Sequence, residues 1–143
     1  MTVEQHLNQL IANWSVLYVK LHHYHWYVKG AQFFTLHEKF EELYEEAAKH
    51  VDELAERLLA IGGKPYSRMK EYLEHATIRE ADGEETAEAM VKRLIDDYML
   101  MVEEARQAKA AAEEANDEAT ADMLLDIQTA LEKHLWMLRA FLG

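Results

Sequence analysis

The sequence predicts an all-α protein in which four long helices form a bundle, with one short extra helix in the link between the second and the third. Half of the 143 residues are hydrophobic, whereas only five are glycine and one is proline, a composition that favours helices over tight turns. Long stretches repeat apolar residues every three or four positions, which is the period of an amphipathic helix. Together with a length typical of one domain, these observations predict a single helical domain over residues 1–143.

The first two of the four long helices cover the N-terminal part of the chain. The first covers about residues 2–28, and His25 lies on its apolar stripe. The second covers about residues 34–61 and stops at the pair Gly62-Gly63, because glycine lacks the side-chain packing and stiffness that favour continued helix.

The link between the second and third long helices is unusually long. A short helix is expected over residues 67–73, capped by its first residue, and a loop over residues 77–85. The third helix is expected to begin near Thr86, and a brief break at Asn116 and Asp117 precedes the fourth. A crossover of this length lets the third helix start at the far end of the bundle.

The formal net charge is −12 at pH 7. An acidic surface repels phosphate backbones and attracts cations, although acidity alone can also serve only solubility. The absence of cysteine excludes disulfides, thiolate metal sites and thiol catalysis. With a polar start that lacks a signal peptide and no apolar run of membrane-spanning length, the sequence predicts a cytoplasmic protein with no membrane association.

One face of the second helix collects an unusual set of possible metal ligands. Taking His37 as zero and about 100° per residue, Glu41 falls near 40°, Asp52 near 60° and Glu56 near 100°. Imidazole and carboxylate together suit iron. His25, on the apolar stripe of the first helix, is the fifth candidate ligand.

These residues cannot all meet in one chain. His37 and Asp52 are 15 residues apart, which is about 22 Å along a helix, and a metal ligand must lie about 2 Å from the ion. Two copies of the second helix packed antiparallel would bring His37 of one copy to Asp52 and Glu56 of the other, which produces two identical sites related by a two-fold axis. Ala48 and Ala55, in the same sector, would allow the close approach.

A di-iron site inside the bundle is the other arrangement known for helical iron proteins, and it uses Glu-x-x-His motifs. None of the eight histidines is preceded by glutamate three positions earlier. The residues at those positions are Val3, Val19, Lys20, His22, Phe34, Ala47, Tyr72 and Leu131. The sequence therefore does not support an intra-bundle site.

Three segments carry a family resemblance. Residues 22–30 (HHYHWYVKG), 33–40 (FFTLHEKF) and 51–57 (VDELAER) resemble the signature of the Dps family, the mini-ferritins of the ferritin-like superfamily named after the DNA-binding protein from starved cells. The helix pattern, including the short crossover helix, is similar over nearly the whole chain. The resemblance implies a ferritin-like bundle and an iron-storing ferroxidase in a hollow dodecameric shell, with hydrogen peroxide as the preferred oxidant.

The resemblance also implies roles for the ligand candidates at the two-fold interfaces. His25 and His37 would come from one subunit, and Asp52 and Glu56 from its partner, with Asp52 bridging two irons. These four are the expected catalytic residues, and iron is both substrate and bound metal. Glu41 stands where some members have a group for the second iron.

Two further assignments rest on the resemblance. Trp26 would lie beside the site, where family members have an aromatic residue that quenches radicals. Asp117, Asp122 and Asp126 would line a three-fold pore that admits iron, since a ring of carboxylates concentrates cations. The alternative for these acids is a helix cap at Asp117 and a solvated helix face for the other two.

Two other functions are compatible with the sequence. The bundle could sequester a metal such as zinc without turnover, or it could be a helical interaction protein without metal. Some family members bind DNA through a lysine-rich N-terminal tail, but here the first lysine is Lys20. With the net charge, this predicts that direct DNA binding is absent.

Overall fold

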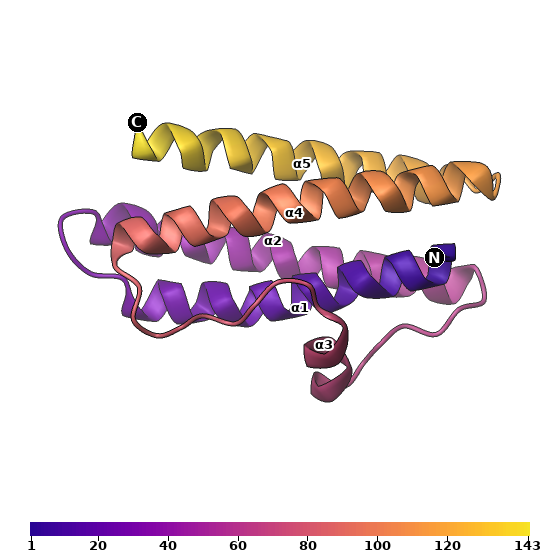
Figure 1. Cartoon of the computed structure of the whole chain (residues 1–143), viewed down its shortest axis with the longest axis horizontal. Coiled ribbons are helices and arrows are strands. Elements are labelled where there is room, and N and C mark those ends of the chain that lie inside the picture. The colour runs from indigo at the N-terminus through magenta and orange to yellow at the C-terminus, as the bar shows by residue number, and fades with distance from the viewer.

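The structure, a computed structural model, describes residues 1–143 and confirms the all-α class. Its five helices are α1 (Val3–Tyr27), α2 (Phe33–Ala60), α3 (Met69–His75), α4 (Ala87–Glu114) and α5 (Glu118–Leu142). The α1/α2 hairpin lies against the α4/α5 hairpin, and the link that contains α3 carries the chain back along the bundle (Figure 1). α2 and α4 therefore run in the same direction, as the long crossover predicted.

The helix ends agree with the sequence except at α3. Thr2 and Gln5 form a reciprocal capping box at the start of α1, and Thr86 caps α4 through Ala89 N–H. The short helix begins at Met69 rather than at residue 67, and Arg68, its N-cap residue, makes no side-chain cap. The prediction of a cap at residue 67 is therefore wrong.

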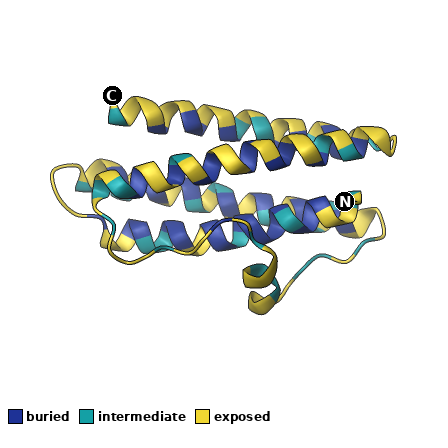
Figure 2. Cartoon of the chain, viewed as in Figure 1, coloured by how far each residue is buried: buried dark blue, intermediate teal, exposed yellow.

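The apolar stripes of the four long helices meet in one core of 31 buried residues. Figure 2 shows the buried faces of the helices turned toward one another and the outer faces exposed. Trp14, Tyr24, Phe40 and Tyr98 are the largest fully buried side chains. None of the helices is both long and apolar enough to span a membrane.

A buried polar network fastens the crossover to the bundle. The Asn13 amide donates to the Thr77 hydroxyl (2.9 Å) and to the Glu104 carboxylate (2.7 Å). The side-chain Oδ1 atom of Asn13 accepts from the backbone N–H of Thr77 at 2.7 Å, and the Thr77 hydroxyl donates to Glu104. Burial raises the pKa of Glu104, although both hydrogen bonds oppose that rise. The link thus gains a fixed path over the bundle.

Ion pairs connect the two hairpins. Lys20 of α1 and Asp97 of α4, both buried, approach to 2.7 Å. Between α2 and α5, Glu46 accepts from His134 at 2.9 Å, and Arg57 donates to Asp117 at 2.9 Å. These contacts set the two hairpins in register on both sides of the apolar core.

Candidate metal centre

His25 and His37 lock each other in place where α1 ends and α2 begins. His25 Nδ1 donates to the His37 carbonyl oxygen at 2.6 Å, and His37 Nδ1 donates to the His25 carbonyl oxygen at 2.7 Å. The two rings are stacked, with centroids 3.7 Å apart and an interplanar angle of 13°. Because each Nδ1 carries the donated proton, each Nε2 keeps a lone pair that can bind a metal.

Glu41 is the one acidic candidate near this pair. Its Oε1 atom lies 3.7 Å from His25 Nε2, with His25 buried and Glu41 half exposed. The structure thus brings together three of the five predicted ligands, from two helices. Within one chain, however, no group of three or more His, Asp or Glu side chains is arranged to hold a metal ion.

Asp52 and Glu56 lie on the exposed face of α2, far from the histidines. The 15 residues of continuous helix between His37 and Asp52 keep them about 22 Å apart. Ala48, between them, is exposed and Ala55 is half-buried. One chain therefore presents two half-sets of ligands on the same helix.

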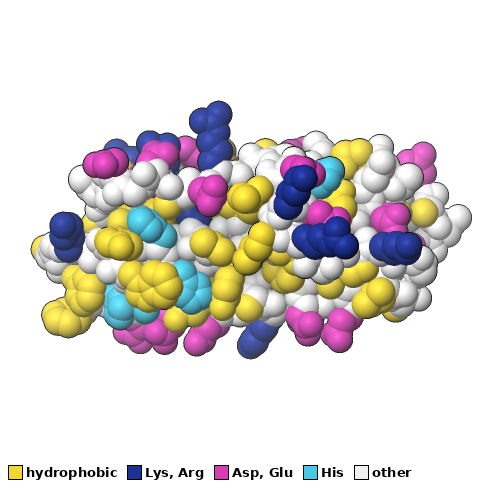
Figure 3. Space-filling model, turned by 90° about the horizontal axis from the view of Figure 1, so that it is seen from below, with side chains coloured by type: hydrophobic (Ala, Val, Ile, Leu, Met, Phe, Trp, Pro, Cys, Tyr) yellow, Lys and Arg dark blue, Asp and Glu magenta, His cyan; other side chains and the backbone are white.

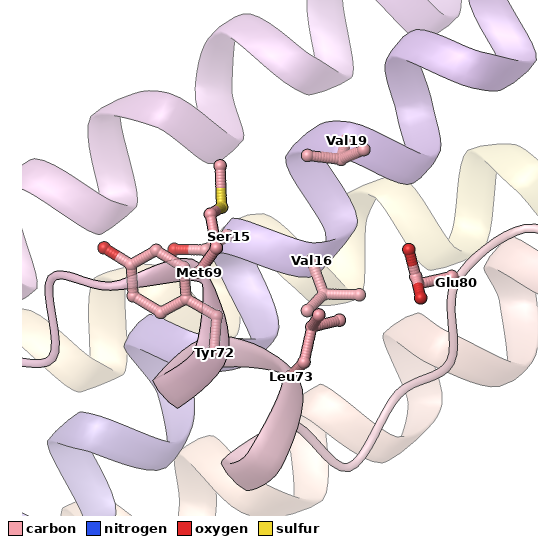
Figure 4. Close-up of a pocket in the computed structure, with 7 residues that line it drawn as sticks. All are labelled: Ser15, Val16, Val19, Met69, Tyr72, Leu73 and Glu80. Carbon is pink, nitrogen blue, oxygen red and sulfur yellow. The ribbon is translucent and has the colours of Figure 1, made fainter.

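An apolar hollow adjoins this face, between α1 and α3. Its lining includes Val16, Val19, Met69 and Leu73 (Figure 4). A neighbouring hollow extends it to Ala48 and Val51 of α2. From below, hydrophobic side chains and histidines gather on this side of the molecule (Figure 3). Of the residues that line the two hollows, Tyr18, Val19, Met69 and Leu73 are exposed.

Aromatic residues surround the imidazole pair. Phe33 stacks on His37 with centroids 4.9 Å apart, and the edge of Tyr44 meets His25 at 5.4 Å. Trp26, the predicted neighbour of the site, is 67% exposed, and its ring centroid lies 5.2 Å from that of His22. Sequence reasoning missed Phe33 and Tyr44, although Phe33 precedes His37 by four residues and so shares its side of the helix.

The acidic residues assigned to a pore have different environments. Asp117 caps α5 by accepting from Thr120 N–H at 3.1 Å, and it also accepts from Arg57. Burial tends to raise the pKa of Asp117, but the hydrogen bonds from Thr120 and Arg57 outweigh it and hold the pKa below its usual value. Asp122 and Asp126 are exposed on α5. Asp117 therefore has the cap role that was its alternative, whereas the other two acids are available to solvent.

The interior of the bundle also contains polar groups. Glu46 accepts from His134, and His50 Nε2 lies 3.4 Å from the same carboxylate oxygen. Burial raises the pKa of Glu46, but the hydrogen bonds and charges of the two imidazoles outweigh it, so the pKa lies well below normal. The His50 ring packs on Trp14 with centroids 4.4 Å apart. These groups stabilise helix contacts, and none of them belongs to a metal-binding group of three.

Comparison with known proteins agrees with this architecture. The ferritin-like domain family matches residues 4–143. DNA protection during starvation protein 2 of Bacillus anthracis is 61% identical over 137 residues, which are 96% of this chain and 94% of that protein.

Solved structures are also similar. The crystal structure of a Dps protein from Bacillus brevis has a TM-score of 0.98 and 56% identity, covering 99% of this chain and 95% of that one. Dps from Listeria innocua, in a structure soaked with zinc, has a TM-score of 0.95 and 42% identity, and the match covers 99% of this chain and 96% of that one. The chain therefore belongs to the Dps family of ferritin-like proteins.

Proposed function

We propose that the protein oxidises iron(II) and stores the product as iron(III) mineral inside a dodecameric shell of identical chains, which protects the cell from oxidative stress. The observation that carries this proposal is the preset imidazole pair, with two Nε2 lone pairs free, on a helix whose own Asp52 and Glu56 cannot reach it. A second copy supplies the missing carboxylates, and two copies together complete two sites. The apolar hollow between α1 and α3 supports contact with that copy on the same face.

The chemistry follows from the ligands. His25 and His37 of one subunit and Asp52 and Glu56 of its partner bind two iron(II) ions, with Asp52 bridging them and Glu41 beside the second. Two iron(II) ions give one electron each to one hydrogen peroxide, which takes up two protons and becomes two waters. Reduction by an electron pair avoids hydroxyl radical, and Trp26, which follows His25 in the chain, is the proposed quencher of any radical that escapes.

Iron reaches the interior through acidic pores in this proposal. Asp122 and Asp126 are the exposed carboxylates that would attract iron(II). Asp117 joins them at the start of α5, where Arg57 partly compensates its charge. The net charge of −12 supports cation uptake in general.

Iron oxidation tests the proposed site directly. With iron(II) and peroxide, the wild-type assembly should generate iron(III) absorbance and a soluble mineral, and zinc should inhibit by occupying the ligands. His25→Ala and Asp52→Ala should each lower the initial rate at least about tenfold, because each removes a ligand. His23→Ala and Glu53→Ala are matched controls that remove neighbouring groups of the same chemistry. Equal rates in Asp52→Ala and Glu53→Ala would contradict the site.

The alternative is a bundle that sequesters metal without turnover. It predicts tight zinc or iron(II) binding by the same ligands but no acceleration of oxidation by peroxide or dioxygen. Zinc, with which a structure of the Listeria innocua relative was soaked, is the probe for this comparison.

We further infer that protection does not require direct contact with DNA, despite the name of the relatives. Lys20, the first lysine, is buried against Asp97, so Lys29 is the first lysine exposed at the surface. No retardation of linear DNA is therefore expected in a mobility-shift assay at low salt. A strong shift that does not require magnesium would contradict this inference.

A further inference from the structure

We propose that Phe33 is a positioning residue that holds the His37 imidazole in its metal-binding orientation and stabilises it once metal is bound. This inference rests on the proposed function, since it assigns a role beside the same ligand pair. Phe33 begins α2, and its ring stacks on His37 with centroids 4.9 Å apart and an interplanar angle of 22°.

The three rings form one column. His25 covers one face of His37, with centroids 3.7 Å apart, and Phe33 packs on His37 at a similarly small interplanar angle. Tyr44 closes the other end by meeting His25 edge-on, at an interplanar angle of 85°. Hydrogen bonds to carbonyl oxygens fix one edge of each imidazole, and the aromatic neighbours restrict the remaining rotation of the rings.

Metal binding introduces electrostatic repulsion between the two stacked imidazoles. A coordinated imidazole loses electron density to the cation, so two stacked imidazoles that both bind metal repel each other across 3.7 Å. The face of a phenyl ring carries negative charge density and attracts a positively polarised group. Phe33 offers that face to His37, and its effect is therefore larger in the metal-bound state than in the metal-free state.

Phe33 and its neighbour Phe34 differ in their contact with His37. Phe34 is 83% exposed and packs against Phe33, with no stacking contact to His37. The two adjacent phenylalanines thus provide a matched pair, in which the same substitution removes a ring with or without contact to the ligand.

Cobalt(II) titration of the assembled protein, followed by visible absorbance, tests the proposal. Phe33→Leu keeps an apolar side chain but removes the aromatic face, and it should weaken cobalt binding about two- to fivefold. Phe33→Tyr should restore the affinity, and Phe34→Leu should leave it unchanged. In the His37→Ala background, Phe33→Leu should have no further effect, because its partner is absent.

The outcomes separate this inference from the proposed function. If His37→Ala leaves cobalt binding unchanged, the ligand assignment itself fails. If His37→Ala weakens binding but Phe33→Leu binds as wild type, only the role of Phe33 is overturned. A Phe33→Tyr variant as weak as Phe33→Leu would also overturn it, because the aromatic face would then be irrelevant.

Discussion

Shells assembled from equal amounts of His25→Ala and Asp52→Ala subunits should regain about a quarter of the wild-type ferroxidase rate, although each variant alone is nearly inactive. Each proposed site takes its histidines from one subunit and its carboxylates from the partner. In a random mixture, about half of the histidine halves are intact and about half of the carboxylate halves are intact. Their product gives the expected quarter.

The recovery depends on the separation of the two half-sets along α2. Because His37 and Asp52 lie on one continuous helix, no motion inside a subunit can join them without breaking that helix. An intra-subunit site would lose one ligand in every subunit of the mixture, and no activity would return. Subunits with different affinity tags, assembled together and purified through both tags, provide the sample, and initial rates with peroxide provide the measurement.

A double variant supplies the control for this experiment. Mixing wild-type subunits with subunits that carry both His25→Ala and Asp52→Ala should also leave about a quarter of the sites intact, since both halves must again be wild type. A site within one subunit predicts recovery near zero in the first mixture and about half of the sites intact in this one, and that pair of results would contradict a shared site. Light scattering on each mixture checks that the assemblies have equal mass.

The sequence predicted the helices well because their signals are local. Apolar residues at helical spacing, the Thr2 and Thr86 caps and the Gly62-Gly63 stop each act within a few residues. The exception is α3, where Ser67 looked like a cap but its backbone N–H donates to the Glu71 side chain at 3.2 Å instead. A short helix held mainly by its packing on α1 has weak signals of its own.

The positions of the candidate ligands on α2 were also predictable, because their spacing is a property of one helix. What could not be predicted is how they are held. The exchange of Nδ1–H···O=C bonds between His25 and His37 depends on the turn that joins α1 to α2, and the His134–Glu46 contact joins residues 88 positions apart. His134 is buried, and its partner could not be predicted because bundle packing sets it.

The buried pair of Lys20 and Asp97 was missed for the same reason, and it has the largest expected effect on stability. Lys20→Met should lower the free energy of unfolding by about 3 to 5 kcal/mol, because it leaves the Asp97 carboxylate buried without a counter-charge. Urea unfolding monitored by circular dichroism measures the change. Lys92→Met is the control, since the Lys92–Glu88 pair is exposed on α4 and should change stability by less than about 0.5 kcal/mol.

The pH dependence of this loss identifies its cause. Burial raises the pKa of Asp97 above its normal value even though Lys20 opposes the rise, and removal of Lys20 should raise that pKa further. A carboxyl group whose pKa is raised by folding contributes stability at low pH and loses it as the pH rises above the pKa of the unfolded chain. The loss of unfolding free energy caused by Lys20→Met should therefore grow from acid toward neutral pH. Adding Asp97→Leu to the Lys20→Met chain should recover most of that free energy. A deficit that does not change with pH would mean that lost packing of the lysine chain, rather than the uncompensated carboxylate, destabilises the variant.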